Sequence, residues 1–144
     1  MTEPRSTSVL RWLGALALLA VGIDHLEQYY ADYYSAVPTI GTLFVLNFAS
    51  ALVVGLALLA PLQRLTERFG HKLAALAAIS GIAIAGGTLG GLLISENGGL
   101  FGFMEVGYRS AIVLSIAFDV ATVLLLGAFL IVRSRAIPRK EIRT

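Results

Sequence analysis

The chain has 144 residues, of which 57% are hydrophobic and 14% are charged, whereas an average soluble domain is about 25% charged. Its mean hydropathy of +0.81 also places it among membrane proteins. It contains no cysteine, which excludes disulfides, thiolate metal sites and thiol redox chemistry.

Four segments are long and apolar enough to cross the hydrocarbon core of a bilayer, which takes about 20 residues of helix. They cover residues 9–29, 39–60, 73–94 and 108–132. Pro38 lies just before the second segment and Pro61 just after it, as expected at helix ends. Short connections favour antiparallel neighbours, so we expect residues 1–144 to form one all-α membrane domain, an up-down-up-down bundle of four transmembrane helices.

Basic residues are distributed unevenly between the two ends of these segments. Ten of the eleven lie before the first span, between the second and third, or after the fourth: Arg5, Arg11, Arg64, Arg68, Lys72, Arg133, Arg135, Arg139, Lys140 and Arg143. By the positive-inside rule, both termini are expected in the cytoplasm of a multi-pass cell-membrane protein. We interpret these residues as anchors at the lipid headgroups rather than as a nucleic-acid contact, and the basic tail 133–144 as an extension of the last helix.

The third segment contains Gly86, Gly87, Gly90 and Gly91, which form two overlapping GxxxG pairs. Such pairs allow the backbones of two membrane helices to approach closely. We expect these glycines to pack against another helix of the same chain, with a homodimer interface as the alternative.

Asp119 lies near the middle of the fourth segment, with apolar neighbours over more than two turns on either side. An aspartate at this depth costs about 2.5–3.5 kcal/mol on insertion scales, so its side chain should face the bundle interior and have a partner. Ser115 and Thr122 share its helix face. The carboxyl is therefore either a structural group that bonds to these hydroxyls or part of a functional site.

Polar residues of the other segments lie in the same half of the membrane. A helix rises about 1.5 Å per residue, which places Asp24, His25 and Asn47 in the outer half together with Asp119. Arg109, at the outer rim, is expected to pair with Glu105 four residues before it or with Glu27. These positions predict an outward-facing ligand-binding pocket formed by Asp24, His25, Glu27, Asn47, Glu105, Arg109, Ser115 and Asp119.

The sequence indicates no reaction, because it contains no Walker loop, catalytic triad or zincin helix, and no catalytic residue is assigned. One histidine with several carboxylates is able to bind a metal, but the spacing matches no ligand motif. Haem ligation by two histidines within one chain fails, because His71 belongs to a cytoplasmic connection. A quinone headgroup is an alternative occupant, with aromatic walls from Tyr29, Tyr30, Phe44, Phe101 and Phe103. The 95–107 connection is expected to fold over the mouth of the bundle, as a lid or as a passive anchor.

Three short elements carry a family resemblance. They are Gly22-Ile23-Asp24-His25, the stretch PTIGTLFVLN with Pro38, Gly41, Phe44 and Asn47, and the stretch EVGYRSAIVLSIAFD with Glu105, Gly107 and Asp119. Together they resemble small, uncharacterised prokaryotic four-helix membrane proteins grouped as DoxX-like. The resemblance covers most of the chain and implies a membrane location and a four-helix fold. The wider group includes proteins associated with quinone oxidoreductases or other redox complexes, but no catalytic role transfers to a defined position.

Three functional hypotheses follow. The leading one is a non-enzymatic accessory or ligand-binding subunit that works in the lipid bilayer, in a membrane complex or a homo-oligomer. The second is a redox component that binds quinone or haem through His25. The third is a purely structural bundle whose polar groups satisfy one another.

Overall fold

The computed structural model describes residues 5–62, 66 and 69–136, and this part of the chain is helical apart from its connections and one isolated bridge. Its elements are α1 (Arg5–Ala31), η1 (Tyr34–Ala36), α2 (Pro38–Leu59), α4 (Gly70–Gly98) and α5 (Ser110–Ala136). All four α-helices are long and apolar enough to cross a membrane. The predicted all-α, four-helix membrane bundle is therefore confirmed.

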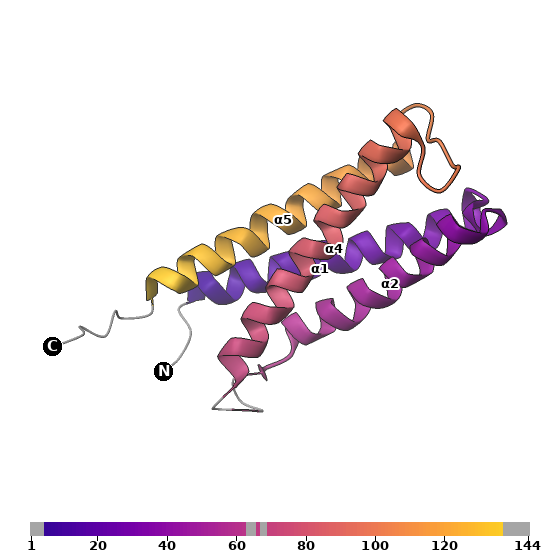
Figure 1. The fold of residues 1–144 in the computed structure, drawn as a ribbon. Coiled ribbons are helices and arrows are strands. Elements are labelled where there is room, and N and C mark those ends of the chain that lie inside the picture. Colours follow the sequence, from indigo (N-terminus) through magenta and orange to yellow (C-terminus); the bar gives the residue numbers. More distant parts are fainter. Residues whose placement is uncertain (1–4, 63–65, 67–68, 137–144) are drawn as a thin grey trace, which may run out of the picture.

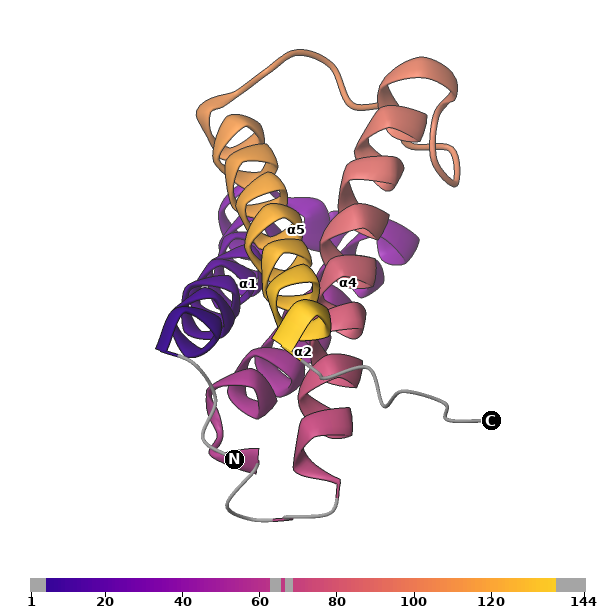
Figure 2. The same ribbon diagram turned by 90° about the vertical axis from the view of Figure 1, so that its left-hand side faces the viewer.

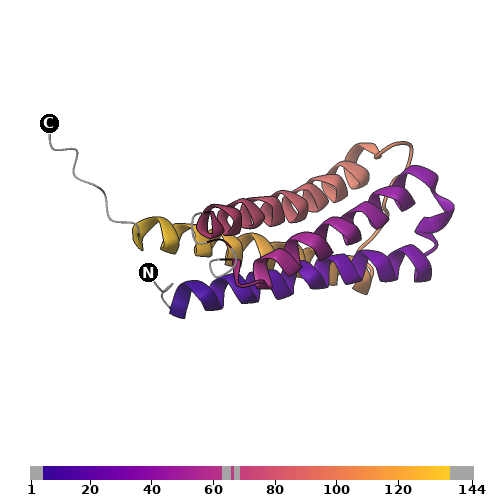
Figure 3. The same ribbon diagram turned by 90° about the horizontal axis from the view of Figure 1, so that it is seen from below.

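The helices alternate in direction along the bundle (Figure 1). One end holds η1 and the 99–109 connection, and we call it the η1 end. The opposite end, where α1 begins and α5 ends, is called the terminal end. Figure 3 shows α1 and α2 returning antiparallel from their shared turn at the η1 end. Which of the two ends faces the cytoplasm stays a prediction.

The helix bounds differ from the predicted spans mainly at the ends. Helix α4 continues through Asn97 and ends only before Gly99, whose φ of 77° stops the helix. Helix α5 reaches Ala136, so the first residues of the basic tail are helical as expected. The rest of the tail, together with Arg64 and Arg68, lies outside the described residues.

The apolar core is concentrated in the terminal half of the bundle. Leu18, Leu58, Leu126 and Phe129 are fully buried there, together with alanines of α1, α2 and α4. Small side chains allow membrane helices to pack closely, since lipid tails solvate large apolar groups as well as protein does. In Figures 1 and 2, α4 approaches α2 at the terminal end and diverges from it toward the η1 end. The η1 half holds the cavity described below.

The close contacts between helices are made at Gly22 and Gly81, which are not among the four glycines predicted to pack. A Cβ atom at Gly22 would lie 3.0 Å from the Cβ of Ala51, which holds α1 against α2. A Cβ atom at Gly81 would lie 2.7 Å from Leu126 Cδ1, where α4 meets α5. These positions need glycine because a neighbouring helix fills the space of the side chain.

The GxxxG pairs of α4 do not have such neighbours within the described chain. A Cβ atom at Gly86, Gly87 or Gly90 would meet no described atom within 4 Å, and one at Gly91 would meet only Leu100, at 3.7 Å. The predicted packing of these pairs against another helix is not confirmed, because α4 has already diverged from α2 at this height.

Arg11 lies between the helices rather than on the surface of the bundle, and it is 4% exposed. Its Nη1 donates to the carbonyl oxygen of Leu58 at 2.7 Å and to that of Ala60 at 3.1 Å. The last carbonyl groups of a helix lack partners within the helix, and a cation near them also interacts favourably with the helix dipole. Arg11 therefore caps the end of α2 and ties α1 to it.

Candidate functional site

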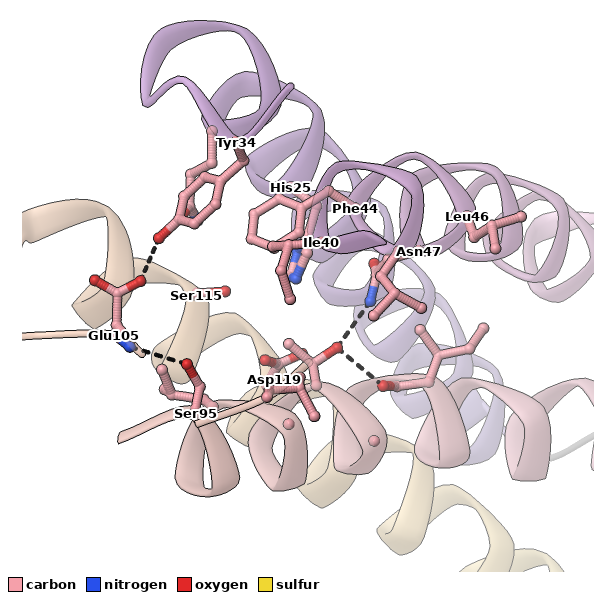
Figure 4. A pocket seen from close by; sticks show the side chains of 18 of the residues that line it. His25, Tyr34, Ile40, Phe44, Leu46, Asn47, Ser95, Glu105, Ser115 and Asp119 are labelled. Carbon is pink, nitrogen blue, oxygen red and sulfur yellow. Dashed lines mark hydrogen bonds between the residues drawn. The ribbon is translucent and has the colours of Figure 1, made fainter. Parts of the chain in front are cut away.

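The η1 half of the bundle contains a cavity of about 410 Å³ between all four α-helices (Figure 4). This volume lies within the range of about 300–1,000 Å³ that is usual for small-molecule sites. Most of the wall is apolar. The polar side chains that line it are His25, Gln28, Tyr34, Asn47, Ser50, Thr88, Ser95, Glu105, Ser115 and Asp119.

The structure brings five of the eight predicted pocket residues to this cavity: His25, Asn47, Glu105, Ser115 and Asp119. The other three lie elsewhere. Asp24 is half-buried beside the cavity and accepts a hydrogen bond from Gln28 Nε2 at 2.7 Å. Glu27 is exposed on the outer face of α1, and Arg109 belongs to a cluster that closes the η1 end.

Asp119 is the most deeply buried acid of the site, at 1% exposure. Its Oδ1 has no hydrogen-bond partner among the described residues. The hydroxyl of Thr122, expected as a partner, instead donates to the carbonyl of Phe118 at 2.8 Å. The carboxyl is therefore not satisfied by the Thr122 hydroxyl of its own helix, and it points into the space that His25 and Asn47 also face (Figure 4).

Asn47 presents a second unpaired acceptor. Its Nδ2 donates to the hydroxyl of Thr88 at 2.7 Å, and that hydroxyl donates in turn to the carbonyl of Ile84 at 3.1 Å. Because the hydroxyl proton of Thr88 is already used, the amide nitrogen of Asn47 must face Thr88. This orientation leaves Oδ1 of Asn47 buried and without a partner in the described chain.

His25 provides a third acceptor. The side chain is 5% exposed, and its Nδ1 lies 2.9 Å from the carbonyl oxygen of Val21. A carbonyl oxygen only accepts, so Nδ1 carries the proton and Nε2 of the neutral ring keeps its lone pair. The ring packs against Phe44 with centroids 4.9 Å apart, which holds it at the cavity wall.

A polar cluster closes the cavity at the η1 end. Arg109 forms ion pairs with Asp32 at 3.1 Å and with Glu105 at 3.6 Å, which confirms the predicted pairing with Glu105. Arg109 also donates to the hydroxyl of Tyr34 at 2.8 Å, and that hydroxyl donates to Glu105. The backbone N–H of Glu105 donates to Ser95 Oγ at 3.0 Å. These contacts tie the 99–109 connection to η1 and α4.

Tyr34 is the centre of this cluster and is 5% exposed, unlike the neighbouring tyrosines. Burial and the hydrogen bond to Glu105 raise the pKa of its hydroxyl above the ordinary value, so the group stays protonated and donates. Its ring stacks on Phe44 at 4.4 Å between centroids and contacts Phe103 at 5.5 Å. Of the predicted aromatic walls, Phe44 and Phe103 line the cavity, whereas Tyr30 and Phe101 are exposed.

Sequence reasoning missed several of the lining residues. Thr88 and Ser95 are seven residues apart and share one face of α4, and Gln28 follows His25 by three on α1, so helical periodicity was a usable signal. Tyr34 had no such signal, because the chain turns it inward after Tyr33 adopts a left-handed φ of 62°.

Neither a metal centre in the described part of the chain nor a known relative identifies the site. Among the described residues, no group of three or more His, Asp or Glu side chains is placed to hold a metal ion. No protein-family model, curated protein or solved structure matches this chain.

Proposed function

We propose that this small polytopic membrane protein is a ligand-binding or accessory subunit whose cavity takes an amphiphilic small molecule. The observation that carries this proposal is Asp119, a buried carboxyl with an unpaired Oδ1 that faces a cavity of ligand size. Leaving a buried acceptor unpaired costs about 1–3 kcal/mol. A ligand that donates to this oxygen removes that cost when it binds.

The unpaired groups define the chemistry that the head of the ligand needs. Oδ1 of Asp119, Oδ1 of Asn47 and Nε2 of His25 are all acceptors at one cavity. Hydroxyl or N–H donors on the ligand are complementary to them. The stacked rings of Tyr34 and Phe44 favour a flat ring on that head. We therefore propose a hydroxyl-bearing ring attached to an apolar body.

The charge distribution supports an orientation for the site. Of the described basic residues, Arg5, Arg11, Lys72, Arg133 and Arg135 lie toward the terminal end, so we place that end in the cytoplasm and the cavity in the outer half of the membrane. In this orientation the Arg109–Tyr34–Glu105 cluster separates the cavity from the outer aqueous phase.

A redox component of DoxX-like type is the second candidate. The Nε2 lone pair of His25 at an aromatic-walled cavity supports it, since a quinol carries two hydroxyl donors and a haem iron takes an imidazole ligand. A haem would need its second axial ligand from elsewhere, because His71, the only other histidine, lies at the terminal end of α4. The purely structural hypothesis is less well supported, because it leaves Oδ1 of Asp119 without a partner among the described residues.

Binding of a resorcinol to the detergent-purified protein tests the proposal. We expect 5-methylresorcinol, a ring with two hydroxyl donors, to raise the melting temperature of the wild-type protein. Asp119→Asn should weaken its binding by about 3- to 10-fold, since a hydrogen bond to a neutral group contributes about 0.5–1.5 kcal/mol. Glu27→Gln is the matched control, because this exposed carboxyl does not line the cavity.

The outcomes separate the candidates. Equal binding by the wild-type protein and Asp119→Asn, or no binding by either, contradicts the proposal. A Soret band in the absorption spectrum that is lost in His25→Ala favours the haem form of the redox candidate. A quinone recovered by extraction from the wild-type protein but not from Asp119→Asn favours the quinone form.

A further inference from the structure

We infer that the ligand comes from the lipid phase and carries one long apolar chain that leaves the cavity sideways, between α2 and α4. This inference rests on the proposed function and adds the ligand class and its route. It begins from an asymmetry of the cavity wall. His25, Ser115 and Asp119 form a buried inner side, whereas the lining residues Leu43, Leu46, Ser50, Ala83 and Gly87 are exposed.

The open side lies at a depth where lipid, not water, surrounds the helices. Leu43 and Ser50 lie roughly 8 and 18 Å along α2 from Pro38, and Gly87 lies roughly 17 Å along α4 from Gly98. The hydrocarbon core of a bilayer is about 30 Å thick, so helices that cross it place these residues among acyl chains. Leu46, which is 56% exposed, marks the rim of this opening.

The route from the aqueous phase, in contrast, is closed by side-chain contacts at the η1 end. At the η1 end, the side chain of Tyr34 is bonded to Glu105 and Arg109, and Arg109 is paired with Asp32. A ligand that enters from water must break this cluster of ion pairs and hydrogen bonds. Between α2 and α4 the described residues form the single side-chain hydrogen bond from Asn47 to Thr88 and no ion pair. The lateral route therefore favours a lipid-soluble molecule.

Gly87 and Gly91 of α4 supply a channel for the apolar chain of the ligand. Gly87 and Gly91 line the cavity, and a Cβ atom at Gly87 would meet no described atom within 4 Å. Glycine in a helix costs about 1 kcal/mol relative to alanine, and here no helix contact within the described chain requires it. A flexible apolar chain lying along this strip explains the missing side chains. The unpaired oxygens of Asp119 and Asn47 at the inner end independently indicate a ligand.

Photo-crosslinking with a matched pair of resorcinols tests the inference in lipid nanodiscs. The long probe is 5-pentadecylresorcinol with a diazirine at mid-chain, and the short probe is 5-methylresorcinol. We expect crosslinks from the long probe on residues 43–50 of α2 and 83–91 of α4, and their loss in Asp119→Asn. Gly87→Leu should fill the strip and reduce these crosslinks at least tenfold, while binding of the short probe changes less than twofold.

Gly90→Leu is the control for the substitution. It makes the same change one turn of α4 away, where a Cβ atom also meets no described atom within 4 Å, but Gly90 does not line the cavity. We expect it to leave both probes unaffected.

Three results would overturn the inference while leaving the proposed function intact, provided that the short probe still binds. They are crosslinks spread equally over other lipid-facing residues such as Val53 and Ile131, crosslinks that persist in Gly87→Leu, and a homodimer that Gly87→Leu and Gly90→Leu disrupt equally. The last result would assign the strip to a second copy of the chain. If neither probe binds the wild-type protein, the proposed function itself fails.

Discussion

Asp119 combines two properties that rarely occur together in a membrane helix. It is fully buried, and its Oδ1 lacks a hydrogen-bond partner among the described residues. Buried acids in membrane segments normally pair with a neighbour, because hydrocarbon cannot solvate them. Thr122, one turn away on the same helix, shows the ordinary solution, since its hydroxyl bonds to the backbone of Phe118.

We predict that Asp119→Leu stabilises the ligand-free protein, although it abolishes ligand binding. Removing an unpaired buried acceptor should raise the free energy of unfolding by about 1–3 kcal/mol, and the adjoining cavity has room for the larger side chain. Thermal unfolding in detergent measures the change. Thr122→Val is the matched control, and we expect it not to stabilise, because that hydroxyl is already satisfied. A destabilised Asp119→Leu would indicate a structural carboxyl with a partner.

At the scale of elements, Arg11 connects α1 to the end of α2. Its buried guanidinium donates to the carbonyl group of Leu58, in the last turn of α2, and to that of Ala60, just after the helix. This cap therefore ties the end of α2 to α1. It thereby helps to set the height of Asn47 against His25 on the same two helices.

We predict that Arg11→Met lowers the free energy of unfolding by at least about 2 kcal/mol, since two hydrogen bonds from a charged donor are lost. Arg11→Lys should restore part of this stability, because an ammonium group reaches fewer acceptors than the guanidinium fork. Chemical unfolding in mixed micelles measures both. Arg5→Met, at an exposed position of the same helix, should have little effect. Equal stability of Arg5→Met and Arg11→Met would show that the cap contributes nothing.

At the scale of the whole molecule, packing and binding occupy opposite halves of the bundle. The terminal half holds the buried leucines and Phe129, where small residues bring the helices together. The η1 half holds the cavity, because α4 diverges there from α2 (Figure 1). This arrangement suits a binding site, because the apolar core of the terminal half anchors the helices that carry the polar side chains of the η1 half.

The orientation of this arrangement is testable because the chain has no cysteine. We predict that Asn97→Cys, on the exposed last turn of α4, reacts with a membrane-impermeant maleimide added to intact cells. Ser134→Cys, exposed near the other end of α5, should react only after permeabilisation. The reverse pattern would place the cavity in the cytoplasmic half and overturn the orientation drawn from the basic residues.

The amino-acid sequence by itself determined the four helices and the height of each polar residue along them. The bilayer imposes apolar runs of a set length and requires each spanning segment to satisfy its own backbone, so composition and proline positions are sufficient to locate helices. Height follows from the fixed rise of a helix, which is why His25, Asn47 and Asp119 were predicted to share a site. The family resemblance added no residue to this list, and it stays a hypothesis.

Only the tertiary structure decided which faces meet and which remain open. Glu27 and Gln28 lie at nearly the same height on α1, but Glu27 faces outward, whereas Gln28 lines the cavity. Tyr34 is brought inward by the left-handed residue Tyr33 in the 32–37 connection, which no periodicity reveals. Gly87 and Gly91 line the cavity rather than a helix contact, because the angle between helices depends on side chains packed elsewhere, in the terminal half.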